Sequence, residues 1–421
     1  MAHVTGLRCR ECRESYPKRL VHACSLCFGP LDVAYDYEAI SRTISKESIA
    51  KGPPTLWRYK DLLPIEQESS IVDIGVGFTP LLRADNLARE LGIKEVYVKN
   101  DSVNPTFSFK DRPSSIAVSK AVEFGSPAVG AASTGNLSGA MAAHAAKARL
   151  PCFIFVPEGL ESSKIAQTLS YGAHVIEVSG TYDQANRLAT EIALTSNIAF
   201  ANINVRPYYV EGSKTLAFEV CEQLGWQAPQ HIIVPVASGA LLHAAWRGLK
   251  ELEEVGLIDG WSTRISAAQA EGCSPIVQAL LKGANEITPV ETPDTICKSL
   301  AIGDPADGYY AIRAVRATKG VGSAPNDEQI LEGVRLLAKM EGVFTEPAGG
   351  TAVAALKQLV EDGKIERDEQ VVLYITGNGL KTQESIAPAL PKPYQIEPTI
   401  ESFRQLVDKL QTPRVKWLEG M

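Results

Sequence analysis

Short apolar segments alternate with longer amphipathic ones along most of the chain. The short segments have the composition of buried strands, and the segments between them have the periodicity of helices. The strands predicted in this way are 95–99, 128–131, 152–156, 174–178, 198–201, 231–236, 264–270, 343–345 and 370–375. Strands that alternate with helices form parallel sheets joined by right-handed crossovers, so the pattern predicts an α/β protein with two doubly wound parallel-sheet domains.

The order of these segments also suggests how the chain is divided. We expect residues 1–35 to form a separate N-terminal segment, 96–205 a smaller α/β domain, and 36–95 together with 206–421 a larger one. Prolines interrupt the tail as far as Pro398, after which a helix is expected to run to Gln411. Two sheet layers imply a cleft, and ligands in such folds bind at the carboxyl ends of the strands.

Composition and charge exclude several classes of partner. The net charge is −7 and basic residues do not cluster with aromatic ones, so neither nucleic acid nor an anionic membrane is an expected partner. We find no apolar segment of membrane-spanning length, and Met1 to Arg10 lack the apolar core of a secretory signal. A cytoplasmic protein with a small-molecule ligand is the expectation.

Four of the eight cysteines are regularly spaced. Cys9-Arg-Glu-Cys12 and Cys24-Ser-Leu-Cys27 are separated by eleven residues, a spacing typical of a zinc ribbon. Four thiolates at this spacing can close a tetrahedral shell and leave no open position for a substrate. We therefore expect a possible structural zinc at Cys9, Cys12, Cys24 and Cys27, with a metal-free remnant as the alternative.

Lys110 is the first candidate for chemistry. It lies where the strand 95–99 and a polar turn lead into a helix that begins at Asp111. The partial positive charge of a helix start disfavours an ammonium, so a partly desolvated lysine there can serve as a nucleophile or base. A solvated surface lysine is the alternative.

Three further turns follow predicted strands. Ser133-Thr134-Gly135-Asn136 offers donors to a small anion such as a carboxylate, or is an ordinary helix cap. The turn formed by Ser238, Gly239, Ala240, Leu241 and Leu242 can point consecutive amides at a phosphate. Thr376 places a hydroxyl at the end of the last core strand, where it can bond an uncharged ring nitrogen.

The segment 204–215 is rich in cations and tyrosines. Arg206 and Lys214 could bind a second anion with the help of Tyr208, although an ordinary interdomain loop would have a similar composition.

In this order, the segments resemble the threonine synthases within the fold type II pyridoxal-phosphate enzymes, the tryptophan-synthase β family. The Lys110 segment is the most specific part, and STGN, ASGALL, RPYYVEGSKTL, GCSP, SLAIGDPADGYY and TGNGLK support it. The resemblance covers nearly the whole chain, because the cysteine pairs and the following Phe-Gly-Pro-Leu also match the family's amino-terminal segment.

The resemblance implies a role for each candidate. Lys110 would carry pyridoxal 5'-phosphate as a Schiff base and move protons once released. Asn136 would bond the phenolic oxygen of the cofactor, Thr376 its ring nitrogen, and the amides of Ser238 to Leu242 its phosphate. Ser133 and Thr134 would bind the substrate carboxylate, and Ser108, Arg206, Tyr208 and Lys214 are candidates for the substrate phosphate. A homodimer is possible.

The implied reaction converts O-phosphohomoserine and water to threonine and phosphate. Two positions depart from this resemblance. Phe107 stands where glycine or histidine is expected, and Asp304 stands where asparagine is expected. The alternatives are a related enzyme that acts on phosphoserine, a threonine dehydratase, and a binding protein that kept the fold. One methylene separates the two phosphorylated substrates, a difference of about 1 to 3 kcal/mol in an apolar pocket.

Overall fold

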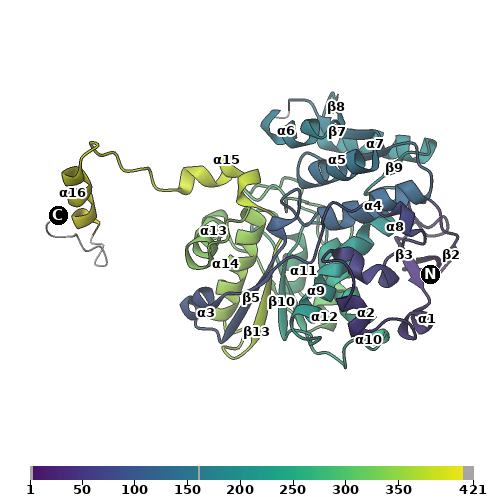
Figure 1. Ribbon diagram of the computed structural model, residues 1–421, viewed down its shortest axis with the longest axis horizontal. Helices are drawn as coiled ribbons and strands as arrows, with labels where there is room; N and C mark the ends of the chain where they lie inside the picture. The colour runs from purple at the N-terminus through teal and green to yellow at the C-terminus, as the bar shows by residue number, and fades with distance from the viewer. Residues whose placement is uncertain (1–2, 160–161, 411–421) are drawn as a thin grey trace.

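The computed structural model describes residues 3–159 and 162–410 of the chain, in which the strands form three sheets (Figure 1). The six-stranded sheet has the order β12 (Gly322–Ser323), β11 (Arg264–Ala268), β10 (His231–Pro235), β13 (Gln370–Ile375), β5 (Glu95–Asn100) and β4 (Leu81–Arg83). The four-stranded sheet has the order β8 (His174–Val178), β7 (Cys152–Pro157), β6 (Val129–Ala132) and β9 (Ala199–Phe200). The N-terminal sheet consists of β2 (Ser15–Tyr16), β1 (Val4–Cys9) and β3 (Leu31–Tyr35).

Helices cover both faces of the six-stranded sheet. One face packs against α9 (Thr215–Gln223), α10 (Ala240–Glu254), α11 (Pro275–Leu281) and α12 (Gly308–Ala317). The other face packs against α3 (Asp85–Leu91), α13 (Asp327–Glu341) and α14 (Pro347–Glu361). The central strand β10 is buried along its whole length, as a parallel strand covered on both faces must be. Apolar residues of α10 recur at helical spacing and face this core.

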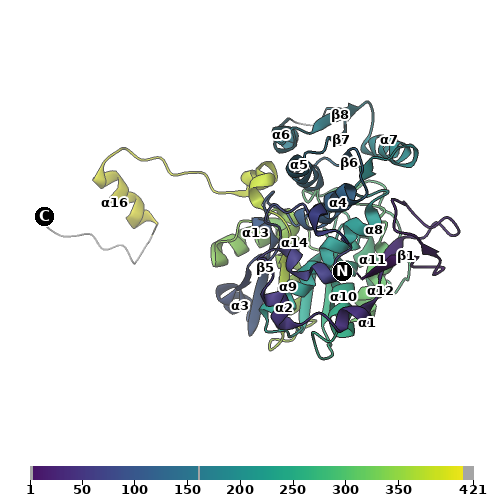
Figure 2. The ribbon, with the colours of Figure 1, turned by 45° about the vertical axis from the view of Figure 1, so that its right-hand side comes forward.

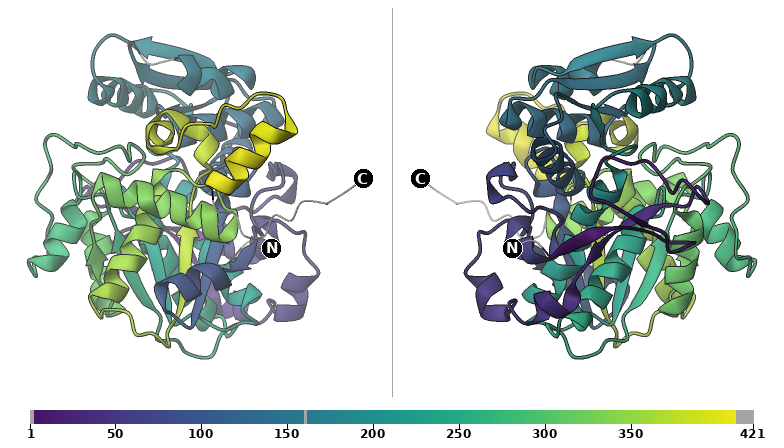
Figure 3. Two further views of the ribbon diagram at one scale, coloured as in Figure 1. Left: turned by 90° about the vertical axis from the view of Figure 1, so that its left-hand side faces the viewer. Right: turned by 90° about the vertical axis from the view of Figure 1, so that its right-hand side faces the viewer.

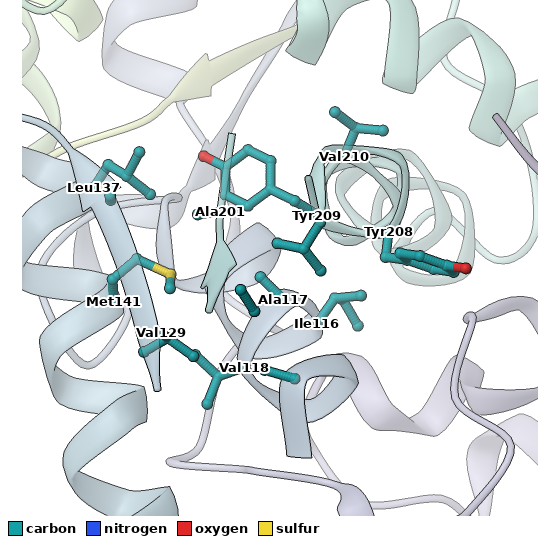
Figure 4. Close-up of a cluster of buried hydrophobic side chains, with 14 of the residues drawn as sticks. Ile116, Ala117, Val118, Val129, Leu137, Met141, Ala201, Tyr208, Tyr209 and Val210 are labelled. Atoms are coloured by element: carbon teal, nitrogen blue, oxygen red, sulfur yellow. The ribbon is translucent and has the colours of Figure 1, made fainter. Parts of the chain in front are cut away.

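The smaller layer is built in the same way and lies beside the large sheet (Figures 1 and 3). Its sheet packs on one side against α5 (Asn136–Ala148) and on the other against α7 (Tyr182–Thr195), and α6 (Ser162–Ser170) lies against α5. Helix α4 (Asp111–Glu123) joins the two layers. Figure 4 shows apolar residues of α4 packed with Val129, Met141 and the segment Tyr208 to Val210.

The remaining elements are short. They are α1 (Tyr37–Ser41), α2 (Lys46–Ala50), α8 (Arg206–Tyr209), α15 (Gln383–Ile386) and α16 (Ile400–Lys409), with 3-10 turns that include η3 (Asp101–Val103) and η4 (Val210–Lys214). Helix α16 stands apart from the body in Figures 1 and 2. It ends before Gln411, the predicted end of this helix, which lies outside the described residues. Within the described ranges, we find no helix with the length and apolar content needed to cross a membrane.

The two parallel-sheet layers confirm the predicted fold class, and two details differ from the prediction. The strand predicted at 95–99 was assigned to the start of the smaller domain, but β5 pairs with β13 in the larger sheet, from Gln370 opposite Glu95 to Ile375 opposite Asn100. The smaller sheet therefore begins only at β6. Residues 343–345 are not a strand: Thr345 forms a single bridge with Asn378, because the chain turns there into α14.

Candidate active site

The turn that holds Lys110 is fastened to the end of the neighbouring strand β13. The amide of Phe109 donates to the Thr376 carbonyl (2.9 Å), and the amide of Asn378 donates to the Phe107 carbonyl (3.0 Å). Between these bonds, Ser108 pairs with Gly377. Lys110 follows directly and precedes the first residue of α4, with its amine 4.8 Å from the centre of the Phe109 ring. The lysine is thus placed at the carboxyl edge of the six-stranded sheet.

Asp111 and Arg112, the two residues after Lys110, are buried, and the polar atoms of their side chains have hydrogen-bond partners. The Asp111 carboxylate accepts from the amide of Thr106 (2.7 Å) and from its hydroxyl (2.9 Å). Arg112 has no exposed surface, and its guanidinium bonds Asp101 (2.6 and 2.8 Å) and Glu219 (2.8 Å). Burial alone would raise the pKa of Glu219, but the positive charges around it, Arg112 foremost, lower this pKa to about 2. These contacts fix the start of α4 and hence the position of Lys110.

Position 107, one of the two departures from the expected residues, has a backbone torsion φ of +64°. This left-handed conformation favours glycine, so Phe107 is strained there. Its side chain is 44% exposed. The other departure, Asp304, lies exposed just before Pro305.

Thr376 and the turn after β10 lie at the same sheet edge as Lys110. The order β10-β13-β5 makes these three parallel strands neighbours, and their carboxyl ends therefore point the same way. Thr376 directly follows β13 and is 5% exposed. Candidate groups for holding one small molecule thus follow three adjacent strands.

The turn at Ser238 and Gly239 leads from β10 into α10. Gly239 has a φ of +94°, and a Cβ added there would lie 2.7 Å from the Asp307 carbonyl oxygen, so only glycine fits. The amides of the first helical turn have no acceptor within the helix, as at any helix start. Ser238 Oγ lies 3.5 Å from the Ala240 amide. This arrangement suits an anion at the first turn of α10.

Asn136 is the first residue of α5 and binds a carboxylate from the larger layer. Its side-chain amide donates to both oxygens of Glu346 (3.0 and 3.3 Å). Glu346 is 2% exposed, and a Cβ on Gly377 would lie 2.4 Å from its carboxyl group. Burial raises the pKa of Glu346, against the opposing effects of the Asn136 bond and of the charges on Lys381 and Lys110.

Glu346 and Lys381 also lie beside these candidate residues, although the sequence alone did not predict a role for either. Lys381 donates to the Thr106 carbonyl (3.0 Å) and to Gln167 Oε1 (2.7 Å), and burial lowers the pKa of its amine. The sequence did show Glu346 in a turn between an apolar segment and a helix, the same context as the other candidates. That context is the signal that could have identified it.

The turn from Ser133 to Gly135 follows β6 in the smaller layer. The Ser133 amide donates to the Phe155 carbonyl (3.2 Å), while its hydroxyl accepts weakly from the Gly135 amide (3.4 Å). Ser133 and Thr134 are partly exposed and Gly135 is exposed. The hydroxyls are therefore accessible at the carboxyl end of a strand, where a substrate carboxylate could bind.

Two of the four residues predicted to bind a substrate phosphate are engaged elsewhere. Tyr208 is buried in the apolar cluster of Figure 4, and its hydroxyl donates to the Arg19 carbonyl (3.3 Å). Lys214 is buried between Glu211 (2.6 Å) and Glu251 (2.7 Å). Both side chains already have partners in the interior, so the structure corrects their predicted placement.

The other two residues of that set, Ser108 and Arg206, contact residues at or beside the proposed site. Ser108 is buried, and its hydroxyl accepts from the amide of Lys110 (3.2 Å). Arg206 pairs with the carboxylate of Asp307, but its side chain stays 19% exposed.

The four N-terminal cysteines meet in space. Their sulfur atoms all lie within 4.8 Å of one another, with Cys9 and Cys27 at 3.4 Å and Cys12 and Cys24 at 3.5 Å. Sulfur atoms around a tetrahedral zinc with Zn–S bonds of about 2.3 Å are separated by roughly 3.8 Å. The thiols thus have the chemistry and spacing for such an ion.

Comparisons of sequence give consistent matches over most of the chain. Residues 72–377 match the family described as "Pyridoxal-phosphate dependent enzyme". A threonine synthase of Methanocaldococcus jannaschii is 41% identical over 405 residues, which cover 96% of this chain and 99% of that protein. A threonine synthase of Methanosarcina acetivorans is 38% identical over 403 residues, covering 95% and 98%.

Solved structures share the fold at lower identity. A fungal L-serine ammonia-lyase from Rhizomucor miehei superposes with a TM-score of 0.61 at 22% identity, covering 74% of this chain and 98% of that one. A threonine deaminase from Solanum lycopersicum gives a TM-score of 0.60 at 20% identity, covering 74% and 83%. These likenesses concern the fold.

Proposed function

The chain belongs to the pyridoxal-phosphate dependent enzymes and, within them, to the threonine synthases, and we propose that it converts O-phosphohomoserine and water to threonine and phosphate. The observation that supports this function best is the meeting of three turns, after β5, β13 and β10, at one sheet edge. They supply a lysine, a hydroxyl and helix-start amides. These are the groups that a phosphorylated aldehyde cofactor requires.

The residues at the site suit pyridoxal phosphate. Lys110 would hold the cofactor covalently through its amine, and the amides from Ser238 to Leu242 would bind its phosphate. Thr376 would bond the ring nitrogen. The Asn136 amide has two hydrogens and donates to both oxygens of Glu346; with cofactor bound, one hydrogen would turn to the phenolic oxygen while the other stays on Glu346.

When bound, the cofactor supplies an electron sink for negative charge at the substrate's Cα and Cβ. Lys110, once released by the substrate amine, moves protons at these two carbons. The hydroxyls of Ser133 and Thr134 bind the substrate carboxylate and so orient Cα toward the lysine. The C–O bond at Cγ breaks with loss of phosphate, Cγ takes up a proton in place of the one removed from Cβ, and water adds at Cβ, which accounts for both products.

Ser108 and Arg206 are the candidates that we retain for the substrate phosphate. Arg206 can contribute a partly exposed guanidinium, although Asp307 already balances its charge. Ser108 is held beside Lys110. Contacts of these two residues with the substrate phosphate would distinguish phosphohomoserine from phosphoserine, which is one methylene shorter.

The test uses purified protein with added cofactor. The wild type should show visible absorbance from bound cofactor and release phosphate from phosphohomoserine with formation of threonine. Lys110→Ala should lose the absorbance and the activity. Lys94→Ala changes an exposed lysine just before the other end of β5 and should keep both.

Other outcomes would contradict the proposal in different ways. Phosphate release from phosphoserine alone would indicate the β-replacement alternative, and ammonia release from threonine would indicate a dehydratase. Protein that remains colourless after reconstitution would indicate a binding protein. The cytoplasmic location and the homodimer stay predictions, and cell fractionation and light scattering measure them.

We further propose that Cys9, Cys12, Cys24 and Cys27 hold one structural zinc. Four converging thiols favour a closed shell, and the small N-terminal sheet has little apolar core of its own. Elemental analysis should find one zinc per chain. The double variant Cys9→Ser, Cys24→Ser should lose the metal together with solubility or folding of this segment, whereas Cys273→Ala should keep the metal. Zinc-free protein purified without chelator would contradict the proposal.

A further inference from the structure

Asp307, at the start of α12, is bonded by two arginines from distant parts of the chain. Arg10 donates to one carboxylate oxygen (3.1 Å), and Arg206 donates to the other. Asp307 is 2% exposed, so neither bond is screened by bulk water. A buried carboxylate with two cationic partners loses much of its stabilisation when one is removed.

The backbone of Asp307 contacts the turn proposed to bind the cofactor phosphate. Its amide donates to the Ser238 carbonyl (2.9 Å), and its carbonyl oxygen closes the space beside Gly239. The same carbonyl accepts from the amide of Ala311 and so continues into α12. Any displacement of Asp307 would therefore displace the turn that opens α10.

Arg10 connects this contact to the cysteine cluster. It lies between Cys9 and Cys12, and its guanidinium also bonds Asp32 (2.7 and 2.8 Å) and stacks over the Tyr310 ring at 4.8 Å. The next residue, Glu11, accepts from the Tyr310 hydroxyl. Both residues enclosed by the first cysteine pair thus contact α12.

A second contact runs from the N-terminal sheet to α10 itself. Asp32, on β3, also pairs with Arg247 of α10 (3.1 Å). The N-terminal segment consequently touches both helices that flank the Ser238 turn. Figure 3 shows this segment lying against the larger layer.

We propose that Arg10 and Asp307 are positioning residues, through which the cysteine-rich segment holds the Ser238 turn and Arg206 in place and couples metal loading to cofactor affinity. The inference rests on the two proposals above, since it assumes that the turn binds the cofactor phosphate and that the four cysteines hold zinc. The second is checked first by elemental analysis, so that absence of metal is distinguished from absence of coupling. Coupling of this kind is reciprocal, so bound cofactor also favours retention of the metal.

The first test measures cofactor affinity by titrating cofactor-free protein and following visible absorbance. Arg10→Ala should weaken binding by about 10-fold or more, a loss typical of residues that support a ligand-binding group. Arg10→Lys keeps the charge but not the paired contacts with Asp32 and Asp307. Its cofactor affinity should lie between those of the wild type and Arg10→Ala. Arg8→Ala, an exposed position two residues earlier, on β1, is the matched control and should bind as the wild type does.

The second test removes the metal. Chelation should weaken cofactor binding in the wild type and have little further effect on Arg10→Ala, because the contact that transmits it is already lost. If Arg10→Ala does not fold, the same comparison is made with Arg10→Lys. A folded Arg10 variant with wild-type affinity overturns the inference, and so does wild-type affinity that is unchanged by metal removal.

Different results would contradict the proposed function and the proposed coupling. Wild-type protein that never binds pyridoxal phosphate contradicts the proposed function. Wild-type protein that binds it, with Arg10→Ala binding equally well, contradicts only the coupling.

Discussion

Glu346 is the carboxylate that faces the proposed reactive lysine. It is buried, orients Asn136 and lies within electrostatic reach of Lys110 and Lys381. A negative charge on the buried Glu346 offsets the positive charges of Lys110 and Lys381. The group therefore has two tasks, to fix an amide and to set the local charge.

We expect Glu346→Gln to retain cofactor and to lose about 10- to 100-fold in turnover, as for other residues that orient a binding group. The amide can still accept a hydrogen bond from Asn136, but the charge is gone. Steady-state rates across a pH series would measure the effect. Glu361→Gln, at the exposed far end of the same helix, is the control, and an unchanged rate in Glu346→Gln would contradict the role.

Asp111 predicts a pH dependence of stability. Burial raises its pKa to about 6, against the lowering effect of the bonds from Thr106, whereas a carboxyl in the unfolded chain has a pKa near 3.9. The folded protein holds the proton more tightly, so the contribution of Asp111 to the free energy of unfolding falls as pH rises from about 4 to 6 and stays low above that.

Asp111→Asn abolishes this titration. Relative to the wild type, the variant should therefore gain about 2 to 3 kcal/mol of unfolding free energy between pH 4 and pH 7. Urea unfolding at each pH measures the difference. A difference that stays constant over this range would show that Asp111 does not titrate there.

At the residue scale, sequence placed some candidates well and others poorly. Thr376 and the Ser238 turn follow strand ends, and the strand order brings them to the edge that holds Lys110. The direction of a side chain in the short helices at 206–214 is not encoded in local composition. There the sequence showed cations and tyrosines, but whether each faces the cleft or the core depends on packing with the N-terminal sheet and α10.

At the scale of elements, the fully buried Arg112 fixes α4 to η3, through Asp101, and to α9, through Glu219. Removing one partner of a buried ion pair typically costs about 3 to 5 kcal/mol, because the remaining charges lose their compensation. Arg112→Leu removes the guanidinium from the buried Asp101 and Glu219, of which Glu219 keeps Lys99 (2.6 Å), and should destabilise the protein by a comparable amount in urea unfolding.

The control is Arg83→Leu, which breaks an exposed pair with Asp85. Surface pairs contribute little, so the stability of this variant should hardly change. Equal effects in the two variants would contradict the importance of the buried network.

The sequence predicted most strands because buried parallel strands have a distinct apolar pattern. It could not assign β5 to its sheet, since pairing with β13 is a contact between residues some 275 positions apart, as between Glu95 and Gln370. It also missed β4 and β12, each of only two or three residues at an edge of the large sheet. Such short segments have too few positions for a pattern.

At the scale of the whole molecule, the proposed cofactor contacts come from two layers. Lys110, Thr376 and the Ser238 turn belong to the larger layer, and Asn136 to the smaller. Bound cofactor should therefore stabilise the complete fold. At a free concentration of 100 times the dissociation constant, we expect about 2.7 kcal/mol.

Thermal unfolding with and without cofactor measures this gain. The melting temperature should rise with cofactor concentration in the wild type, and the gain should be smaller in Lys110→Ala. A shift of equal size in both would indicate binding that does not involve the lysine.

The fastening of the Lys110 turn to β13 has a consequence for how new specificities could arise. Three of the groups proposed to hold the cofactor are attached to one rigid sheet, whereas the turn proposed for the substrate carboxylate belongs to a layer inserted into the chain between β5 and β10. Substitutions in that inserted layer can reshape the substrate side while the reactive lysine keeps its bonds. The protein thus keeps most of its proposed cofactor contacts and its proposed contact to the substrate carboxylate in separately variable parts of one chain.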